Sequence, residues 1–104
     1  MRLGSACIIA ATAVAILASA APPPSATARP PERIYATTCG YCHGRNVGPV
    51  IRGRQLPVDA IVAIVRAGQN GMPAFRPTEI APAELNQLAK WISTSAADPA
   101  EHGN

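Results

Sequence analysis

The 104-residue sequence predicts an all-α domain of three helices, spanning residues 31–95. Apolar residues recur at helical spacing in three segments, and loops that contain Gly and Pro separate these segments. No segment has the apolar–polar alternation of a half-buried strand, and no internal repeat is visible. The predicted domain is about 65 residues long, and a core of this size seldom stabilises itself without a disulfide, a metal or another cross-link. We therefore expect the helices to enclose an additional group.

The first helix is expected over about residues 31–42, because proline suits a first helical turn and Glu32 follows where the helix dipole favours an anion. The second is expected over residues 57–67, with Gly68 as its C-terminal stop. Its apolar face consists of Ile61, Ile64 and Val65. The third is expected over about residues 82–93, with one apolar stripe formed by Leu85, Leu88, Ala89 and Ile92.

Residues 1–20 are predicted to be a signal peptide. Arg2 precedes an uncharged, alanine-rich apolar run over residues 6–21, which ends in small residues. The run is about 16 residues long and falls short of the roughly 20 needed to span a bilayer. We expect export to the periplasm, cleavage between Ala20 and Ala28, and no stable membrane insertion afterwards.

The two ends of the expected domain have no apolar periodicity. Residues 21–30 are predicted to be an extended leader rich in Pro and Ala, and residues 96–104 a flexible tail with nothing to bury.

The formal charge of +3 is small and is unfavourable for nucleic-acid binding. Arg52 and Arg54 form a local basic patch, which is either a solvated loop or a partner for an acidic group.

The chemistry resides in the segment Cys39-Gly40-Tyr41-Cys42-His43, which has the C-x-x-C-H pattern of haem attachment. On a helix the two thiols and the imidazole project from one face, so the thiols can add to two vinyl groups while the imidazole reaches the iron. We expect Tyr35, one turn earlier, to share that face.

Three other uses of this motif are less consistent with the sequence. A thioredoxin-like thiol pair needs a preceding strand, which is missing. A zinc site needs four ligands, and the remaining histidine, His102, lies in the predicted tail. A plain disulfide would leave His43 unexplained. Cys7 is expected to leave with the signal peptide.

Met72 is the predicted sixth ligand of the iron, because it is the one methionine outside the signal peptide. Gly71 allows close backbone approach, and Pro73 biases Met72 toward an extended conformation. His102 is the alternative ligand. A carbonyl such as that of Pro49 could accept the second N–H of the histidine, although the same segment could be an ordinary turn. Trp91 is expected to cover either the haem edge or the first helix.

The chain resembles the class I cytochromes c over residues 31–93. Four motifs carry the resemblance: Cys39-Gly40-Tyr41-Cys42-His43-Gly44, Gly48-Pro49, Gly71-Met72-Pro73-Ala74-Phe75, and Glu84-Leu85-x-x-Leu88-Ala89-x-Trp91-Ile92. The resemblance implies three helices wrapped around one covalently bound haem c. It also implies thioether links at Cys39 and Cys42 and axial ligation by His43 and Met72. The Pro49 carbonyl would be bonded to the histidine, and the first and last helices would cross near Tyr35 and Trp91.

The motif regions at residues 38–44 and 72–76 look more narrowly like the small cytochrome subunits of p-cresol methylhydroxylase and eugenol hydroxylase type flavoproteins. We therefore expect an electron-transfer protein rather than an enzyme, with a flavoprotein dehydrogenase as electron donor and a respiratory-chain acceptor. Lys90 is the one lysine, so any electrostatic docking must use arginine. The alternatives are a haem enzyme or gas sensor with an open sixth position, and a metal-free thiol redox module.

Overall fold

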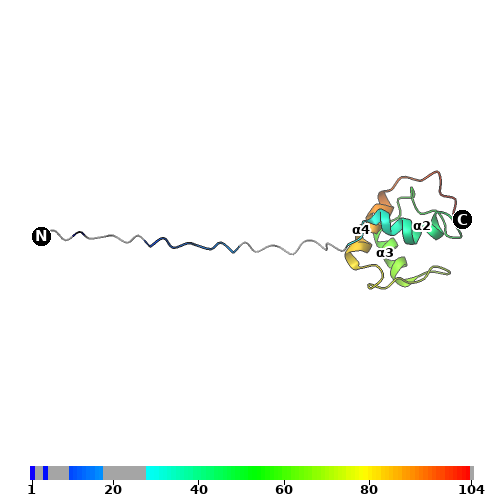
Figure 1. Ribbon diagram of the computed structural model, residues 1–104. Coiled ribbons are helices and arrows are strands. Elements are labelled where there is room, and N and C mark those ends of the chain that lie inside the picture. Colours follow the sequence, from blue (N-terminus) through cyan, green and yellow to red (C-terminus); the bar gives the residue numbers. More distant parts are fainter. Residues whose placement is uncertain (2–3, 5–9, 18–27, 104) are drawn as a thin grey trace.

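A computed structural model describes residues 1, 4, 10–17 and 28–103 of the chain (Figure 1). Most of the predicted signal peptide and leader, including the cleavage zone before Ala28, lies outside the described residues. Residues 10–17 are exposed and have no regular secondary structure. Within the described residues the regular elements are all helical, as predicted, and a single β-bridge joins Gln69 and Met72.

The first predicted helix is continuous from residue 31 to residue 43 but changes its winding twice. An α-helical turn, α1 (Pro31–Ile34), leads into a π-helical segment, η1 (Tyr35–Cys39), and then into α2 (Gly40–His43). The Gly40 N–H bonds the Tyr35 carbonyl five residues earlier. A side chain at position 40 would press on Tyr35, because its Cβ would lie 3.2 Å from the Tyr35 oxygen. Glycine therefore permits the wide turn just before the second cysteine.

The second and third predicted helices are confirmed with small shifts at their ends. Helix α3 (Val58–Ala67) follows Pro57 and stops at Gly68, whose φ of 72° is in the left-handed region that glycine tolerates. Helix α4 (Pro82–Thr94) is one residue longer than expected. Its stripe is buried as predicted, and the four side chains are 0–2% exposed.

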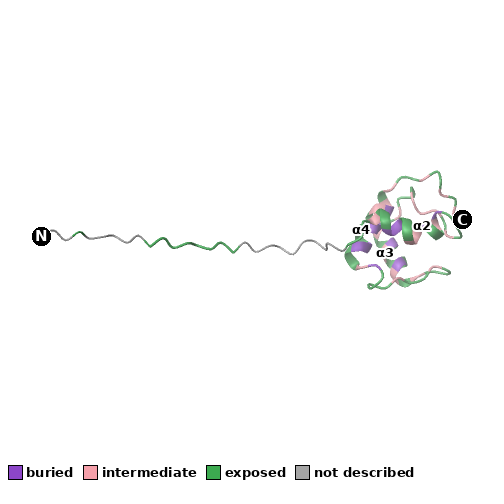
Figure 2. Cartoon of the chain, viewed as in Figure 1, coloured by how far each residue is buried: buried purple, intermediate pink, exposed green. Residues whose placement is uncertain are grey.

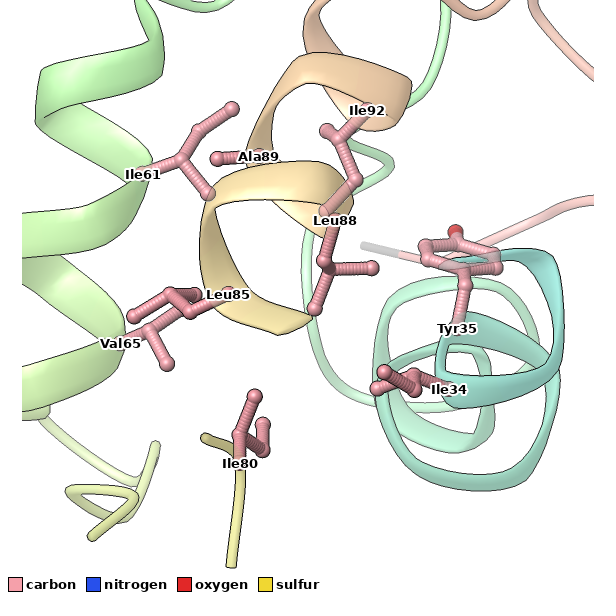
Figure 3. Packing of buried hydrophobic residues seen from close by; sticks show 9 residues of the cluster. All are labelled: Ile34, Tyr35, Ile61, Val65, Ile80, Leu85, Leu88, Ala89 and Ile92. Atoms are coloured by element: carbon pink, nitrogen blue, oxygen red, sulfur yellow. The ribbon is translucent and has the colours of Figure 1, made fainter. Parts of the chain in front are cut away.

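The core forms where α4 packs against α3 on one side and against the first helix on the other (Figures 2 and 3). In Figure 3, Ile61 and Val65 of α3 and Ile34 and Tyr35 of the first helix flank the α4 side chains. Ile80, 2% exposed, closes the cluster below α4. Burying a large apolar side chain stabilises the fold by about 1.5–3 kcal/mol relative to leaving it exposed.

Residues 96–103, called the C-terminal segment below, were predicted to have nothing to bury, but they make buried contacts. It runs from the end of α4 back to the end of α2 (Figure 1), where the His102 N–H donates to the Gly44 carbonyl at 2.8 Å. The side chain of Glu101 is only 8% exposed. The sequence prediction was wrong because it considered apolar burial alone, and this segment is held by polar groups.

Arg29, which the sequence places in the leader, is bonded to the start of α4. Its backbone N–H and its Nε both donate to Glu84 Oε2, at 2.9 and 3.0 Å. Glu84 Oε1 in turn accepts the N–H of Ala81, the residue that precedes α4. The folded part therefore begins two residues earlier than the predicted boundary.

Candidate functional site

The candidate site is a hollow of about 700 Å³ between the first helix and the loop that follows α3. This volume is within the usual range for small-molecule and cofactor pockets, roughly 300–1,000 Å³. Its wall comes from four segments: Thr38, Cys39, Cys42 and His43; Val47, Gly48, Pro49, Ile51, Arg54 and Leu56; Ile64 of α3; and Gln69, Asn70, Gly71, Met72, Pro73 and Phe75. Residues at the two conspicuous sequence motifs thus face one space.

One wall of the hollow carries the attachment motif. Cys39 is half-buried and Cys42 is exposed, and neither forms a disulfide. Burial raises the pKa of the Cys39 thiol to about 11, so it is protonated at neutral pH as long as nothing is attached to it. The motif crosses from η1 into α2 at Gly40, and it places both sulfurs and the His43 ring along the same wall.

His43 is held by the loop that comes directly after it. Its Nδ1 lies 2.8 Å from the carbonyl oxygen of Pro49, which is the hydrogen bond that the sequence suggested. A carbonyl can only accept, so Nδ1 carries the proton and Nε2 is the nitrogen left to bind a metal. Gly48 makes this geometry possible, because a Cβ there would lie 2.9 Å from Nδ1.

Met72 lies on the wall contributed by the loop after α3. The chain reverses beyond Gly68, and Gln69 and Met72 exchange two backbone hydrogen bonds of 3.1 and 2.9 Å. Asn70, at the tip, has a φ of 53°, which asparagine adopts more readily than most residues. Phe75 N–H donates to the Val65 carbonyl at 2.8 Å and fastens the far side of the loop to α3.

The residues that line the hollow fit a haem. The thiols and imidazole needed for attachment and ligation stand on one wall, and a thioether stands on another. Apolar side chains supply most of the remaining surface, which suits the faces of a porphyrin. The partly exposed Ile64 and the cationic Arg54 border the same space.

Two predicted positions are placed differently. Tyr35 does not line the hollow but lies buried in the core, whereas Thr38, the residue before Cys39, lines the hollow. Trp91 covers the first helix, which is one of the two positions that the sequence allowed, and its ring centroid lies 5.1 Å from that of Tyr35, as the predicted helix crossing requires. Ile64 leaves the core face and faces the hollow. His102 does not line the hollow.

The two arginines of the predicted patch have separate environments. Arg52 is not a solvated loop residue, because its guanidinium lies 4.9 Å from the Trp91 ring centroid and 3.4 Å from Asp98. Arg54 lines the hollow and donates to the Val50 carbonyl at 3.3 Å.

Some of the lining was not found from the sequence. Val47 and Leu56 contribute to the wall, but their spacing matches no helical stripe and no ligand motif. The proximity of Leu56 to the attachment motif is a tertiary contact without a local pattern. Phe75 had a usable signal, since it lies three residues after Met72 on a segment stiffened by Pro73.

This arrangement of helices, with a C-x-x-C-H turn facing a methionine loop, defines a c-type cytochrome domain. Residues 26–92 match the family model described as cytochrome c oxidase, cbb3-type, subunit III, and the chain belongs to this cytochrome c family. Membership of this family implies that the chain binds haem c, as the sequence predicted.

Two curated relatives support this assignment. Over 72 residues the chain is 39% identical to the cytochrome c subunit of 4-cresol dehydrogenase (hydroxylating) from Pseudomonas putida, covering 67% of this chain and 64% of that protein. Over 70 residues it is 36% identical to cytochrome c-550 from Bacillus subtilis (strain 168), covering 61% of this chain and 55% of that protein. The chain thus spans less than two thirds of the length of either relative.

Solved structures agree with the fold. A chain in the crystal structure of p-cresol methylhydroxylase with substrate bound is 39% identical and superposes with a TM-score of 0.58, covering 64% of this chain and 93% of that chain. Outer membrane cytochrome F from Geobacter sulfurreducens, 23% identical with a TM-score of 0.53 over 64% of this chain and 99% of that one, shares the fold. In the described part of the chain, no helix has the length and apolar character to cross a membrane.

Proposed function

We propose that the chain is a periplasmic electron carrier with one covalent haem, attached at Cys39 and Cys42 and ligated by His43 and Met72. The observation that carries this proposal is the common hollow, which brings the attachment motif and the single candidate thioether to facing segments. The hydrogen bond from His43 Nδ1 to Pro49 supports it, because metal-bound histidines usually donate their second N–H in this way.

The ligand set favours electron transfer over oxygen or peroxide chemistry. When bound, the haem would supply a one-electron iron couple. Met72 would close the sixth position and, as a soft ligand, favour the ferrous state, which raises the reduction potential. Pro49 would keep His43 in the tautomer that presents Nε2. The apolar wall would exclude water from the ring faces.

We infer that the electron donor is a flavoprotein dehydrogenase that oxidises phenolic compounds, and that a respiratory-chain component accepts the electrons. The identity of 39% to a subunit of 4-cresol dehydrogenase supports this inference. An epitope-tagged chain, purified from its native cells, is expected to bring with it a protein that contains flavin. Recovery of the haem protein without any flavin absorbance would contradict it.

The axial ligand is tested by comparing Met72→Ala with His102→Ala in the haem-loaded protein. Met72→Ala should abolish the weak long-wavelength absorption band that accompanies iron–thioether ligation in ferric cytochromes, lower the reduction potential and allow added imidazole to bind. His102→Ala is the control, because His102 is exposed and outside the hollow.

The opposite pattern, with His102→Ala changing the spectrum and Met72→Ala leaving it unaltered, would overturn the Met72 assignment. Ready binding of imidazole or carbon monoxide by the unsubstituted protein would favour the alternative, a haem enzyme or gas sensor with an open sixth position.

A further inference from the structure

The C-terminal segment makes its contacts with the part of the chain that holds His43. It ends beside α2 (Figure 1), and its Glu101 lines a second, smaller hollow together with Tyr35 and Gly40. The segment does not line the hollow, so the proposed haem site does not by itself account for these contacts.

A buried polar cluster fixes the segment in place. Glu101 Oε2 accepts the Tyr35 hydroxyl at 2.6 Å, and Glu101 Oε1 lies 3.6 Å from Arg52 Nη1. The same guanidinium reaches Asp98 at 3.4 Å and covers the ring of Trp91. Burial and the hydrogen bond to Glu101 raise the pKa of Tyr35 above its ordinary value, so the hydroxyl remains a donor at neutral pH. A charge-assisted hydrogen bond this short is among the stronger ones in proteins.

The backbone beyond this cluster closes on the residues next to His43. The His102 N–H bonds the Gly44 carbonyl, and a Cβ on Gly44 would lie 3.1 Å from Glu101 Oε2. A Cβ on Gly103 would lie 2.7 Å from the His43 carbonyl oxygen and would overlap the carbonyl oxygen of Gly48. The segment therefore touches the chain at residues 43, 44 and 48.

These contacts enclose the loop that supplies the carbonyl for His43. From inside, the Gly48 N–H donates to the Cys42 carbonyl at 2.9 Å. From outside, Gly103 packs against the Gly48 carbonyl, one peptide unit before Pro49. The position of the Pro49 oxygen thus depends on the two contacts of Gly48, one with Cys42 and one with Gly103.

We propose that the C-terminal segment, anchored by Glu101, is a positioning element for the iron-binding histidine. It holds the loop of residues 44–48 so that the Pro49 carbonyl keeps its hydrogen bond to His43 Nδ1. This inference rests on the proposed function, because it assigns a role in tuning a haem that His43 ligates.

The expected consequence is electronic as well as structural. A histidine that donates a firm Nδ1–H bond is a more basic ligand, and a more basic ligand favours ferric iron. Loosening the segment weakens that bond, so the reduction potential should rise. It also exposes the Nδ1 proton to solvent more often.

The test uses Tyr35→Phe and Glu101→Gln in the haem-loaded protein. Tyr35→Phe removes the 2.6 Å hydrogen bond and keeps every charge, so its effect cannot come from a lost carboxylate. Both variants should raise the reduction potential, and both should speed hydrogen exchange of the His43 Nδ1–H in the ferrous protein about tenfold, as followed by NMR. Glu32→Gln is the charge-matched control, because Glu32 is exposed on α1, and it should change neither quantity.

A purely structural segment would give a different result. If Tyr35→Phe and Glu101→Gln lower the melting temperature while the potential and the exchange rate stay at the control values, the positioning role is wrong. Gly103→Ala, which presses directly on the loop, provides a third variant should Glu101→Gln fold poorly. Failure of the proposed function would appear separately, as an unsubstituted protein that carries no covalent haem.

Discussion

Gly68 stands at the start of the loop that carries Met72 and lies close to the backbone of that loop. Its φ of 72° is unfavourable for alanine, and an added Cβ would lie 2.8 Å from both the Met72 carbonyl oxygen and the Ala74 nitrogen. Gly68→Ala should therefore destabilise the haem-loaded protein by about 1–2 kcal/mol or more and weaken the iron–thioether band. Thermal unfolding and the ferric spectrum measure the two effects.

Ala63→Gly provides the matched comparison for this prediction. Ala63 is exposed in the middle of α3, and glycine there costs about 1 kcal/mol through helix propensity. It should lower the melting temperature to a similar degree and leave the band intact. Equal spectra for the two variants would show that Gly68 does not position the loop.

At single positions, the sequence predicted best where chemistry requires a local pattern. Cys39, Cys42 and His43 were predicted to share one face because the proposed attachment and ligation need fixed spacing on one turn, and all three line the same hollow. Tyr35 was expected on the same face as the motif, but it lies in the core against Trp91. Helical spacing alone assumes a uniform α-helix and cannot reveal the π-helical turn that begins at Tyr35.

At the scale of single elements, the stability of the N-terminus of α4 is expected to depend on pH. Arg29 and the Ala81 N–H lower the pKa of Glu84 from 4.5 to about 2, chiefly through the hydrogen bonds from the Arg29 guanidinium and backbone. A lowered carboxyl pKa adds stability that is complete above the unfolded value and is lost as the pH falls through the folded value. The contribution of Glu84 should therefore disappear between about pH 4.5 and pH 2.

Glu84→Gln measures this contribution. The variant should be less stable than the unsubstituted protein at neutral pH, and the difference should shrink as the pH falls through that window. Denaturant unfolding at a series of pH values provides the measurement, with Glu32→Gln on the exposed side of α1 as control. A constant difference between Glu84→Gln and the unsubstituted protein at all pH values would refute the assignment.

At this scale, periodicity predicted α3 and α4 almost to the residue, because one buried stripe defines an amphipathic helix. The same reasoning failed for the two ends of the domain. Arg29 and Glu101 are held by ion pairs and hydrogen bonds to residues 55 and 66 positions away, and no local pattern reveals such partners.

At the scale of the whole molecule, the hydrophobic core and the hollow occupy different parts of the domain. Nine buried side chains form one cluster, while the hollow occupies the space between the first helix and the Met72 loop. A core this small needs an additional source of stability, which we assign to the haem. His43→Ala and Cys39→Ser should therefore yield little folded protein.

Far-ultraviolet circular dichroism and denaturant unfolding of haem-free material check this prediction. Helix content should be reduced and the unfolding transition broad. A sharp, cooperative transition in haem-free protein would show that the nine-residue core stabilises the chain alone, and that the haem does not hold the fold together.

The mass of the mature, exported polypeptide tests the central claim most directly. The account predicts the mass of a chain cleaved between Ala20 and Ala28 plus that of one haem, retained after denaturation because two thioether bonds hold it. A mature chain that weighs no more than its amino acids would contradict the account.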